Sequence, residues 1–146
     1  MGSGVASREL AQAAEEVGRL LAESGCALVC GGLGGVMEAA ARGAKEAGGT
    51  TIGVLPGESR LEANRWIDHA VATGIGHARN LAVVASGDAV IAVGGEWGTA
   101  SEVAFARKLG RPVVLLGRGP AIEGDGIQRA ATPAEAVELA LAAAGP

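Results

Sequence analysis

Short apolar runs alternate with longer amphipathic segments along the chain, and this alternation restricts the fold more than any other sequence feature. Helices of about ten residues or more between strands favour a parallel sheet covered on both faces. The sequence therefore predicts one Rossmann-like, three-layer α/β domain over residues 1–146, with no linker or repeat. Strands are expected at 27–30, 50–55, 67–73, 89–93, 112–116 and 127–130, and helices at 8–23, 36–47, 78–86, 99–109 and 133–144.

Capping residues mark the ends of the first and last helices. Ser7 precedes the first helix as an N-cap, and Gly25 follows it. Thr132-Pro133-Ala134-Glu135 has the pattern of a capping box with proline at the first helical position. These local signals support the expected helix boundaries.

The chain begins on a loop, whereas a Rossmann-like fold begins on a strand. Gly2-Ser3-Gly4-Val5-Ala6-Ser7 is typical of a connection from a strand to a helix. The first strand of such a sheet is central. We therefore expect a strand upstream of Met1, so that the first strand is missing from this chain. A fold that never had this strand is the alternative.

Charge and composition argue against several classes of partner. Twelve basic and sixteen acidic residues leave a net charge of −4, which disfavours a nucleic acid or an anionic membrane surface as partner. The only aromatic residues are Trp66, Trp97 and Phe105, too few for a platform on which bases stack. No apolar run is long enough to span a membrane, and no signal peptide is recognisable. Cys26, directly before the expected strand at 27–30, and Cys30 would lie on one face of that strand, which is poor geometry for a disulfide. A reduced, cytoplasmic protein is therefore expected.

Three glycine-rich loops each lead into an expected helix: residues 2–7, 31–35 and 94–99. The carboxyl ends of parallel strands meet at one edge of the sheet, where ligands bind. Glycine lets the backbone approach a ligand, and helix N-termini favour an anion such as phosphate. The loops therefore predict a phosphate or nucleotide site, although tight turns need glycine in any case. There is no Walker motif, and Ser7 stands where a complete GxGxxG would have its third glycine.

Few polar residues accompany these loops. Arg79 begins an expected helix, and Glu102 lies three residues after Thr99 on the first turn of another. Thr99 and Glu102 are also compatible with a simple capping box, and Arg79 with a surface ion pair. His77 is interpreted as a loop residue, and two histidines without an acidic cluster predict no metal site.

These motifs resemble those of the SLOG superfamily, which contains the Lonely Guy phosphoribohydrolases, the DprA-related proteins and the molybdenum cofactor carrier proteins. Residues 31–37 (GGLGGVM) resemble the GGxxGLM loop of the phosphoribohydrolases, and residues 94–102 (GGEWGTASE) their PGGxGTxxE motif. The resemblance implies a catalytic pair, Arg79 and Glu102. It also implies a set of residues that hold a phosphate-bearing ligand: Gly4, Ser7, Gly31, Gly32, Gly34, Gly35, Met37, Gly94, Gly95, Glu96, Gly98 and Thr99.

Several positions depart from the phosphoribohydrolase pattern. Gly94 replaces proline, Glu96 replaces a phosphate-loop glycine, and Ser101 replaces an acidic residue. A carboxylate at Glu96 would repel a phosphate unless it points away or is neutralised. Glu38 also stands where the hydrolases usually have glycine. These departures are closer to the uncharacterised DprA-related branch that includes the cofactor carriers.

Three classes of function follow. The first is a binding or carrier protein for a nucleotide-like, phosphate-bearing small molecule, for which molybdopterin is one candidate. The alternative is an enzyme that hydrolyses the N-glycosidic bond of nucleoside 5′-monophosphates, and a purely structural module is the third. Lysine decarboxylase activity, a label sometimes given to these relatives, is disfavoured because Lys45 and Lys108, the only lysines, lie late in expected helices.

The expected partners are a small phosphorylated ligand and further copies of the chain. No cofactor is required, although a bound nucleotide, phosphate or molybdenum cofactor is compatible with the loops. The alanine-rich helices at 10–21 and 99–109 are suited to close packing across a two-fold axis. A homodimer or homotetramer is therefore expected.

Overall fold

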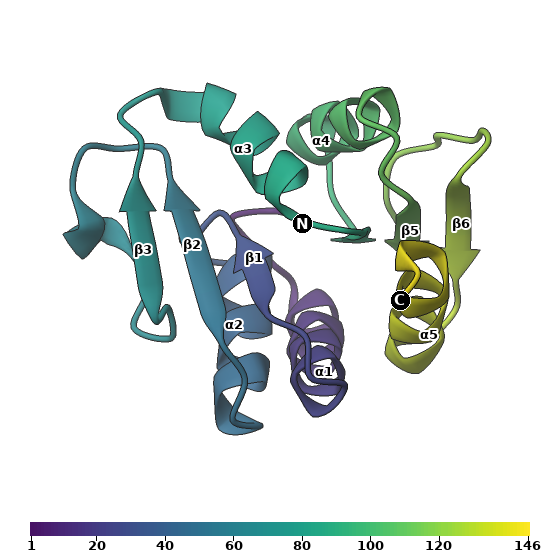
Figure 1. Ribbon diagram of the computed structural model, residues 1–146, viewed down its shortest axis with the longest axis horizontal. Helices are drawn as coiled ribbons and strands as arrows, with labels where there is room; N and C mark the ends of the chain where they lie inside the picture. The colour runs from purple at the N-terminus through teal and green to yellow at the C-terminus, as the bar shows by residue number, and fades with distance from the viewer.

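A computed structural model describes all residues from Met1 to Pro146. Six strands and five α-helices follow one another along the chain, and at two points one strand follows another without an α-helix between them (Figure 1). The strands are β1 (Leu28–Cys30), β2 (Thr51–Leu55), β3 (His69–Ala72), β4 (Val90–Val93), β5 (Val113–Leu116) and β6 (Ile127–Ala130). The helices are α1 (Arg8–Glu23), α2 (Val36–Glu46), α3 (Arg79–Ser86), α4 (Trp97–Lys108) and α5 (Pro133–Ala144), with 3₁₀ turns η1 (Arg60–Glu62) and η2 (Gly76–Ala78).

The expected elements are present, with boundaries close to those predicted. The caps have their expected roles: the Ser7 side chain accepts from the Leu10 N–H, and the Thr132 side chain accepts from the Glu135 N–H. One helix differs in a way that affects the site. Helix α4 begins at Trp97 with Glu96 in the N-cap position, two residues earlier than expected. Thr99 therefore lies inside the first turn, so the interpretation of Thr99 and Glu102 as a capping box is wrong.

The strands form two three-stranded parallel sheets. One has the order β1-β2-β3 and the other β4-β5-β6. Registers are regular in both: Cys30 pairs with Gly53 in the first sheet, and Val93 with Leu116 in the second. The structure thus confirms parallel strands flanked by helices, but β1 and β4 are not hydrogen-bonded to each other.

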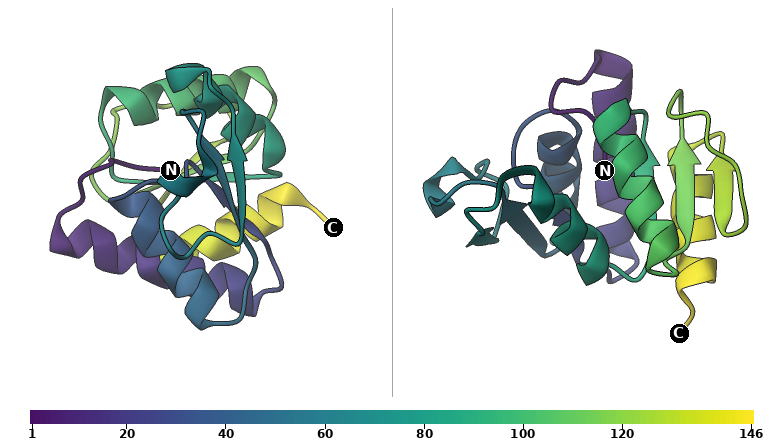
Figure 2. Two further views of the ribbon diagram at one scale, coloured as in Figure 1. Left: turned by 90° about the vertical axis from the view of Figure 1, so that its left-hand side faces the viewer. Right: turned by 90° about the horizontal axis from the view of Figure 1, so that it is seen from above.

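Helices cover both faces of the strands (Figure 2). In β5, Val114 and Leu116 belong to a core cluster with residues of α1, α2 and α5. Their neighbours Val113 and Leu115 belong to a second cluster with residues of α3 and α4. Since successive side chains of a strand point to opposite faces, the two clusters are the two sides of a three-layer domain.

Helices α1 and α2 cross very closely, and two glycines permit it. A Cβ at Gly18 would lie 2.0 Å from the Ala40 carbonyl oxygen, and one at Gly43 would lie 1.9 Å from the Glu15 carbonyl oxygen. An ion pair between Arg42 and Glu15, with 2.6 Å between Nη2 and Oε2, borders the crossing. The small residues of α1 are therefore used inside the protomer, against α2.

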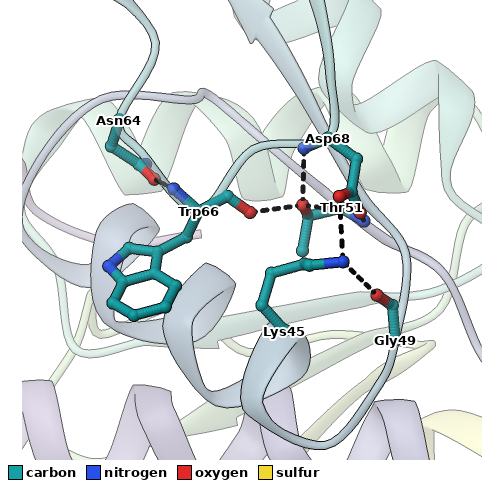
Figure 3. Close-up of polar contacts among 6 residues, drawn as sticks. All are labelled: Lys45, Gly49, Thr51, Asn64, Trp66 and Asp68. Atoms are coloured by element: carbon teal, nitrogen blue, oxygen red, sulfur yellow. Dashed lines mark hydrogen bonds and ion pairs between the residues drawn. The ribbon is translucent and has the colours of Figure 1, made fainter.

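A polar cluster ties the end of α2 to the start of β3 (Figure 3). Lys45 Nζ lies 2.9 Å from Asp68 Oδ1 and donates to the Gly49 carbonyl. The other Asp68 oxygen accepts from the Thr51 N–H at 2.9 Å. The hydrogen bond from Lys45 holds the pKa of Asp68 below its usual range. Because these partners saturate one another, the cluster is a structural tie.

No helix is both long and apolar enough to cross a bilayer. Cys26 and Cys30 are both free, and only Cys30 is buried.

Candidate functional site

A polar cavity of ≈ 260 Å³ lies where the first turns of α2, α3 and α4 meet the N-terminal segment. Two of its thirteen lining residues are hydrophobic, so it is suited to a polar or charged ligand. Its lining comprises Met1, Gly2, Ser3, Gly4, Gly31, Met37, His77, Arg79, Asn80, Glu96, Gly98, Thr99 and Glu102.

Arg79 is the first residue of α3 and is 9% exposed. Its guanidinium donates to the side chain of Asn80, while the buried Nε has no hydrogen-bond partner. Burial lowers the pKa of Arg79, but an arginine pKa starts so high that the group remains a cation at neutral pH. The expectation of a surface ion pair is wrong. Arg79 is instead a buried cation with an unused donor beside the cavity.

Glu102 lies on the first turns of α4 and is 7% exposed. Burial raises the pKa of the Glu102 carboxyl, while the Met1 amine and Arg79 act in the opposite direction. Desolvation dominates because a carboxylate loses more from leaving water than it gains from cations that do not contact it. A buried carboxyl with a raised pKa is a candidate for proton transfer or for holding a hydrogen-bond donor of a ligand.

The loop from residue 94 to residue 99 needs its first two glycines. Gly94 and Gly95 have φ angles of 60° and 115°. A Cβ at Gly95 would lie 2.3 Å from the Thr99 Oγ1, so a side chain here would collide with the residue that lines the cavity. The two glycines therefore shape the turn that presents Gly98 and Thr99 to the cavity.

The loop from residue 31 to residue 35 makes room for Arg79. A Cβ at Gly31 would lie 2.6 Å from both Arg79 Nη1 and Met37 Sδ. At Gly35, where φ is 66°, a Cβ would lie 2.4 Å from the Ser3 carbonyl oxygen. Val36 N donates to that same carbonyl at 3.0 Å. This loop thus packs against the N-terminal segment and against Arg79 together.

The structure brings together part of the expected site. Both expected catalytic residues, Arg79 and Glu102, line the cavity. So do six of the expected ligand-binding residues: Gly4, Gly31, Met37, Glu96, Gly98 and Thr99. The other six do not line it: Ser7, Gly32, Gly34, Gly35, Gly94 and Gly95.

Five lining residues were not expected from the sequence: Met1, Gly2, Ser3, His77 and Asn80. The N-terminal residues belong to the first glycine-rich loop, so their neighbourhood was indicated although the individual positions were not. His77 and Asn80 lie within two residues of Arg79 in the chain, and that proximity was the available signal. Asn80 supplies the only hydrogen-bond partner that the structure gives to the Arg79 guanidinium.

The arrangement suits an anionic ligand with polar substituents. The first turns of α2, α3 and α4 all contribute to one cavity. The Val36 N–H of α2 and the Arg79 N–H of α3 already donate to backbone carbonyls, so the N–H groups that start α4 are the ones left to face an anion. Arg79 adds a full positive charge. Glu96 also lines the cavity but is exposed, so solvent screens its charge. No group of three or more His, Cys, Asp or Glu side chains is arranged to hold a metal ion.

The parallel strands, flanking helices and polar cavity at their carboxyl ends define a Rossmann-like α/β protein with a ligand-binding type of pocket. A family model for the SLOG cluster4 family matches residues 1–142. The chain therefore belongs to the SLOG cluster4 family, in agreement with the resemblance seen in its glycine motifs.

Individual relatives cover nearly the whole chain. An uncharacterised protein of Archaeoglobus fulgidus is 45% identical over 141 residues, which is 97% of this chain and 91% of that protein. The molybdenum cofactor binding protein of Rippkaea orientalis has a TM-score of 0.85 at 37% identity, covering 92% of this chain and 87% of that one. The molybdenum cofactor carrier protein of Chlamydomonas reinhardtii has a TM-score of 0.84 at 39% identity, with 94% and 89% covered.

Proposed function

We propose that the protein binds and carries a small, phosphate-bearing, nucleotide-like molecule, with the molybdenum cofactor as the first candidate. The observation that carries this proposal is the buried Arg79, whose Nε has no partner and whose guanidinium borders a polar cavity. A buried cation with an unused donor is costly unless an anion completes it. The relatives described as binding or carrying the molybdenum cofactor support this choice of ligand.

In this proposal the phosphate lies against the first turn of α4. The N–H groups near Gly98 and Thr99 donate to the phosphate oxygens, and the Thr99 hydroxyl, which is 3% exposed, adds a further donor. Arg79 neutralises the charge from the opposite side of the cavity, at the start of α3. Gly31 and Gly4 leave space for the rest of the ligand because neither has a side chain.

A second candidate function is hydrolysis of the N-glycosidic bond of a nucleoside 5′-monophosphate. The specific observation in its favour is the raised pKa of Glu102 in the same cavity as Arg79. Cleavage proceeds through an oxocarbenium-like ribose, which a carboxylate stabilises or supplies with an activated water. Arg79 would then orient the ribose phosphate.

One experiment separates the two functions. The protein is incubated with AMP, and the mixture is resolved by chromatography beside a Glu102→Gln variant. Intact AMP with Arg79-dependent binding supports the carrier function. Free adenine and ribose 5-phosphate that depend on Glu102 would instead support the hydrolase.

A second measurement addresses the preferred ligand. Molybdenum cofactor released from a molybdoenzyme is mixed with the protein under reducing conditions, and the bound fraction is recovered by gel filtration. We expect the cofactor to co-elute with the protein and to survive longer than free cofactor. Failure of both AMP and the molybdenum cofactor to bind would contradict the proposal of a phosphate-bearing ligand.

A further inference from the structure

Glu96 presents an unpartnered carboxylate at the start of α4. It is the N-cap residue of the helix, yet its side chain accepts no hydrogen bond from the helix N–H groups. It also takes part in none of the four ion pairs of the protein. The carboxylate is exposed and belongs to the lining of the cavity. Glu96 is therefore a free negative charge on the wall of the candidate site.

The same helix end has unpaired backbone donors. Ala100 is the first residue of α4 whose N–H joins the helical ladder, donating to the Glu96 carbonyl at 2.9 Å. The N–H groups of Trp97, Gly98 and Thr99 precede that ladder and favour an anion. In the proposed function a phosphate occupies this position, so the phosphate and the Glu96 carboxylate are neighbours at one helix end. Two anions this close repel each other unless a cation lies between them.

Arg79 lies across the cavity at the start of α3, the helix beside α4 (Figures 1 and 2). It is more than nine-tenths buried, and its Nε has no partner, so it is an unsatisfied cation in the cavity wall. An anion that completes Arg79 must at the same time be tolerated by Glu96.

The charges of the lining do not offset both anions. Glu102 is a second carboxyl there and forms no ion pair. With Glu102 protonated, as its raised pKa favours, Arg79 and Glu96 cancel each other. A phosphate monoester then adds about −1.5 to −2. His77 is the remaining titratable side chain of the lining, and burial lowers the pKa of the Met1 amine. The protein thus supplies little net positive charge for a phosphate.

Magnesium has the ligand preferences that this site offers. Mg²⁺ takes oxygen ligands, retains several of its waters, and is typically held by one or two carboxylates together with substrate phosphates. An exposed carboxylate suits a hydrated cation, because the water ligands stay in contact with solvent. No group of three or more His, Cys, Asp or Glu side chains could hold a metal ion alone, so the phosphate must complete the coordination.

We propose that the Glu96 carboxylate binds a hydrated divalent cation, Mg²⁺ as the first candidate, that bridges it to the phosphate of the ligand at the start of α4. This inference rests on the proposed function, because the phosphate supplies the other oxygen ligands. The cation and the phosphate bind together, and each raises the affinity of the other by the same factor. Glu96, in place of a phosphate-loop glycine, thus makes the site selective for a metal-complexed ligand.

Isothermal titration calorimetry with AMP measures this coupling. The parent protein and the variants Glu96→Gln, Glu102→Gln and Glu138→Gln are titrated with Mg²⁺ or with EDTA at one ionic strength. Glu138 is the matched control, because it is exposed on α5 and does not line the cavity. Since Mg²⁺ also associates with free AMP, the role of Glu96 is measured by the difference between the variants.

We expect Mg²⁺ to strengthen AMP binding by about tenfold or more in the parent and in Glu138→Gln. Glu96→Gln should lose this effect. Without Mg²⁺, it should bind AMP about 3- to 10-fold more tightly than the parent, because the repulsion between the carboxylate and the phosphate is absent. A variant with a damaged site would bind more weakly under both conditions. The electron paramagnetic resonance signal of free Mn²⁺ gives a second readout: AMP should increase Mn²⁺ retention by the parent but not by Glu96→Gln.

Equal Mg²⁺ dependence in the parent and Glu96→Gln would overturn the inference and leave the proposed function intact. Loss of the Mg²⁺ effect in Glu102→Gln, with the effect retained in Glu96→Gln, would also overturn it and assign the cation to the other carboxyl. AMP that fails to bind the parent under either condition would count against the proposed function itself, and the inference would fall with it.

Discussion

Arg79, on the first turn of α3, and Glu102, on the second turn of α4, border the same cavity and form no ion pair. Both are buried, at 9% and 7% exposed, and each influences the pKa of the other through space. Two opposite charges that are held apart in a cavity leave room for a ligand between them. This separation differs from a structural salt bridge, whose partners satisfy each other.

Glu102→Gln is expected to stabilise the fold increasingly as pH rises. The folded-state pKa of Glu102 is raised, so the native state binds more protons than the unfolded state and stability falls as pH rises through this window. Glutamine does not ionise, so the variant does not lose folding stability at residue 102 as pH rises. We expect the variant to melt about 2–4 °C above the parent at pH 8, and less above it at pH 5. A constant difference across this pH range would contradict the assigned shift.

Arg79→Ala is expected to weaken binding of AMP or the molybdenum cofactor about 10- to 100-fold, because hydrogen bonds to a charged group are lost. Arg79→Lys keeps the charge but loses the planar fork of donors, so its ligand affinity should lie between those of the parent protein and Arg79→Ala. Arg129→Ala is the matched control, since Arg129 is exposed on β6. Isothermal titration calorimetry measures all four proteins. Equal losses for Arg79→Ala and Arg129→Ala would exclude a specific role of Arg79.

Gly31→Ala is expected to displace the Arg79 side chain, because the new Cβ would lie 2.6 Å from Nη1. Ligand affinity should fall by roughly tenfold or more, as a displacement of about 1 Å is enough to disrupt a charge-assisted contact. Gly34→Ala offers a comparison in the same loop, since Gly34 does not line the cavity and a Cβ there would come no closer than 3.6 Å to any neighbouring atom. The same titrations apply. Retained affinity in Gly31→Ala would show that the ligand does not use Arg79 in its present position.

Gly18→Ala is expected to destabilise the protein by about 2–3 kcal/mol, because the α1–α2 crossing cannot accept a methyl group without backbone movement. The added Cβ would lie 2.0 Å from a backbone oxygen of α2. Gly98→Ala, also within a helix, has open space around the new Cβ and should be neutral or stabilising by about 0.5–1 kcal/mol. Chemical denaturation compares the two variants. A similar change in the free energy of unfolding for Gly18→Ala and Gly98→Ala would mean that helix propensity, and not the α1–α2 crossing, controls the stability of these variants.

Self-association is expected through α3 and α4. Leu81, Trp97, Phe105 and Leu109 are exposed on these two contacting helices, with Trp97 90% exposed. We expect Phe105→Glu to convert a dimer or tetramer to smaller species, measured by light scattering after gel filtration. Leu61→Glu is the control: Leu61 lies in η1 and is 95% exposed, and its substitution should leave the oligomer unchanged. A wild-type monomer, or equal disruption by both variants, would refute this expectation.

Local sequence determined the elements of this protein. Caps such as Ser7 and Thr132, apolar runs such as residues 113–116, and glycines at the ends of helices act over a few residues, so their effects can be predicted without the fold. The glycine motifs also indicated the edge of the sheet at which the site lies. Arg79 and Glu102 could be singled out because their motifs resemble those of a known superfamily.

Only the tertiary structure decided what these residues contact. Whether Arg79 is a surface cation or a buried one depends on α3 packing beside the loop at Gly31, which is 48 residues away in the chain. Whether Glu102 is a capping residue or a cavity carboxyl depends on α4 starting at Trp97. The strands divide into two sheets, and Met1 pairs with β4, because of backbone contacts between segments that are far apart in the sequence. Burial and desolvation come from neighbours distant in sequence, so the charges that define the site became interpretable only once the helices were in place.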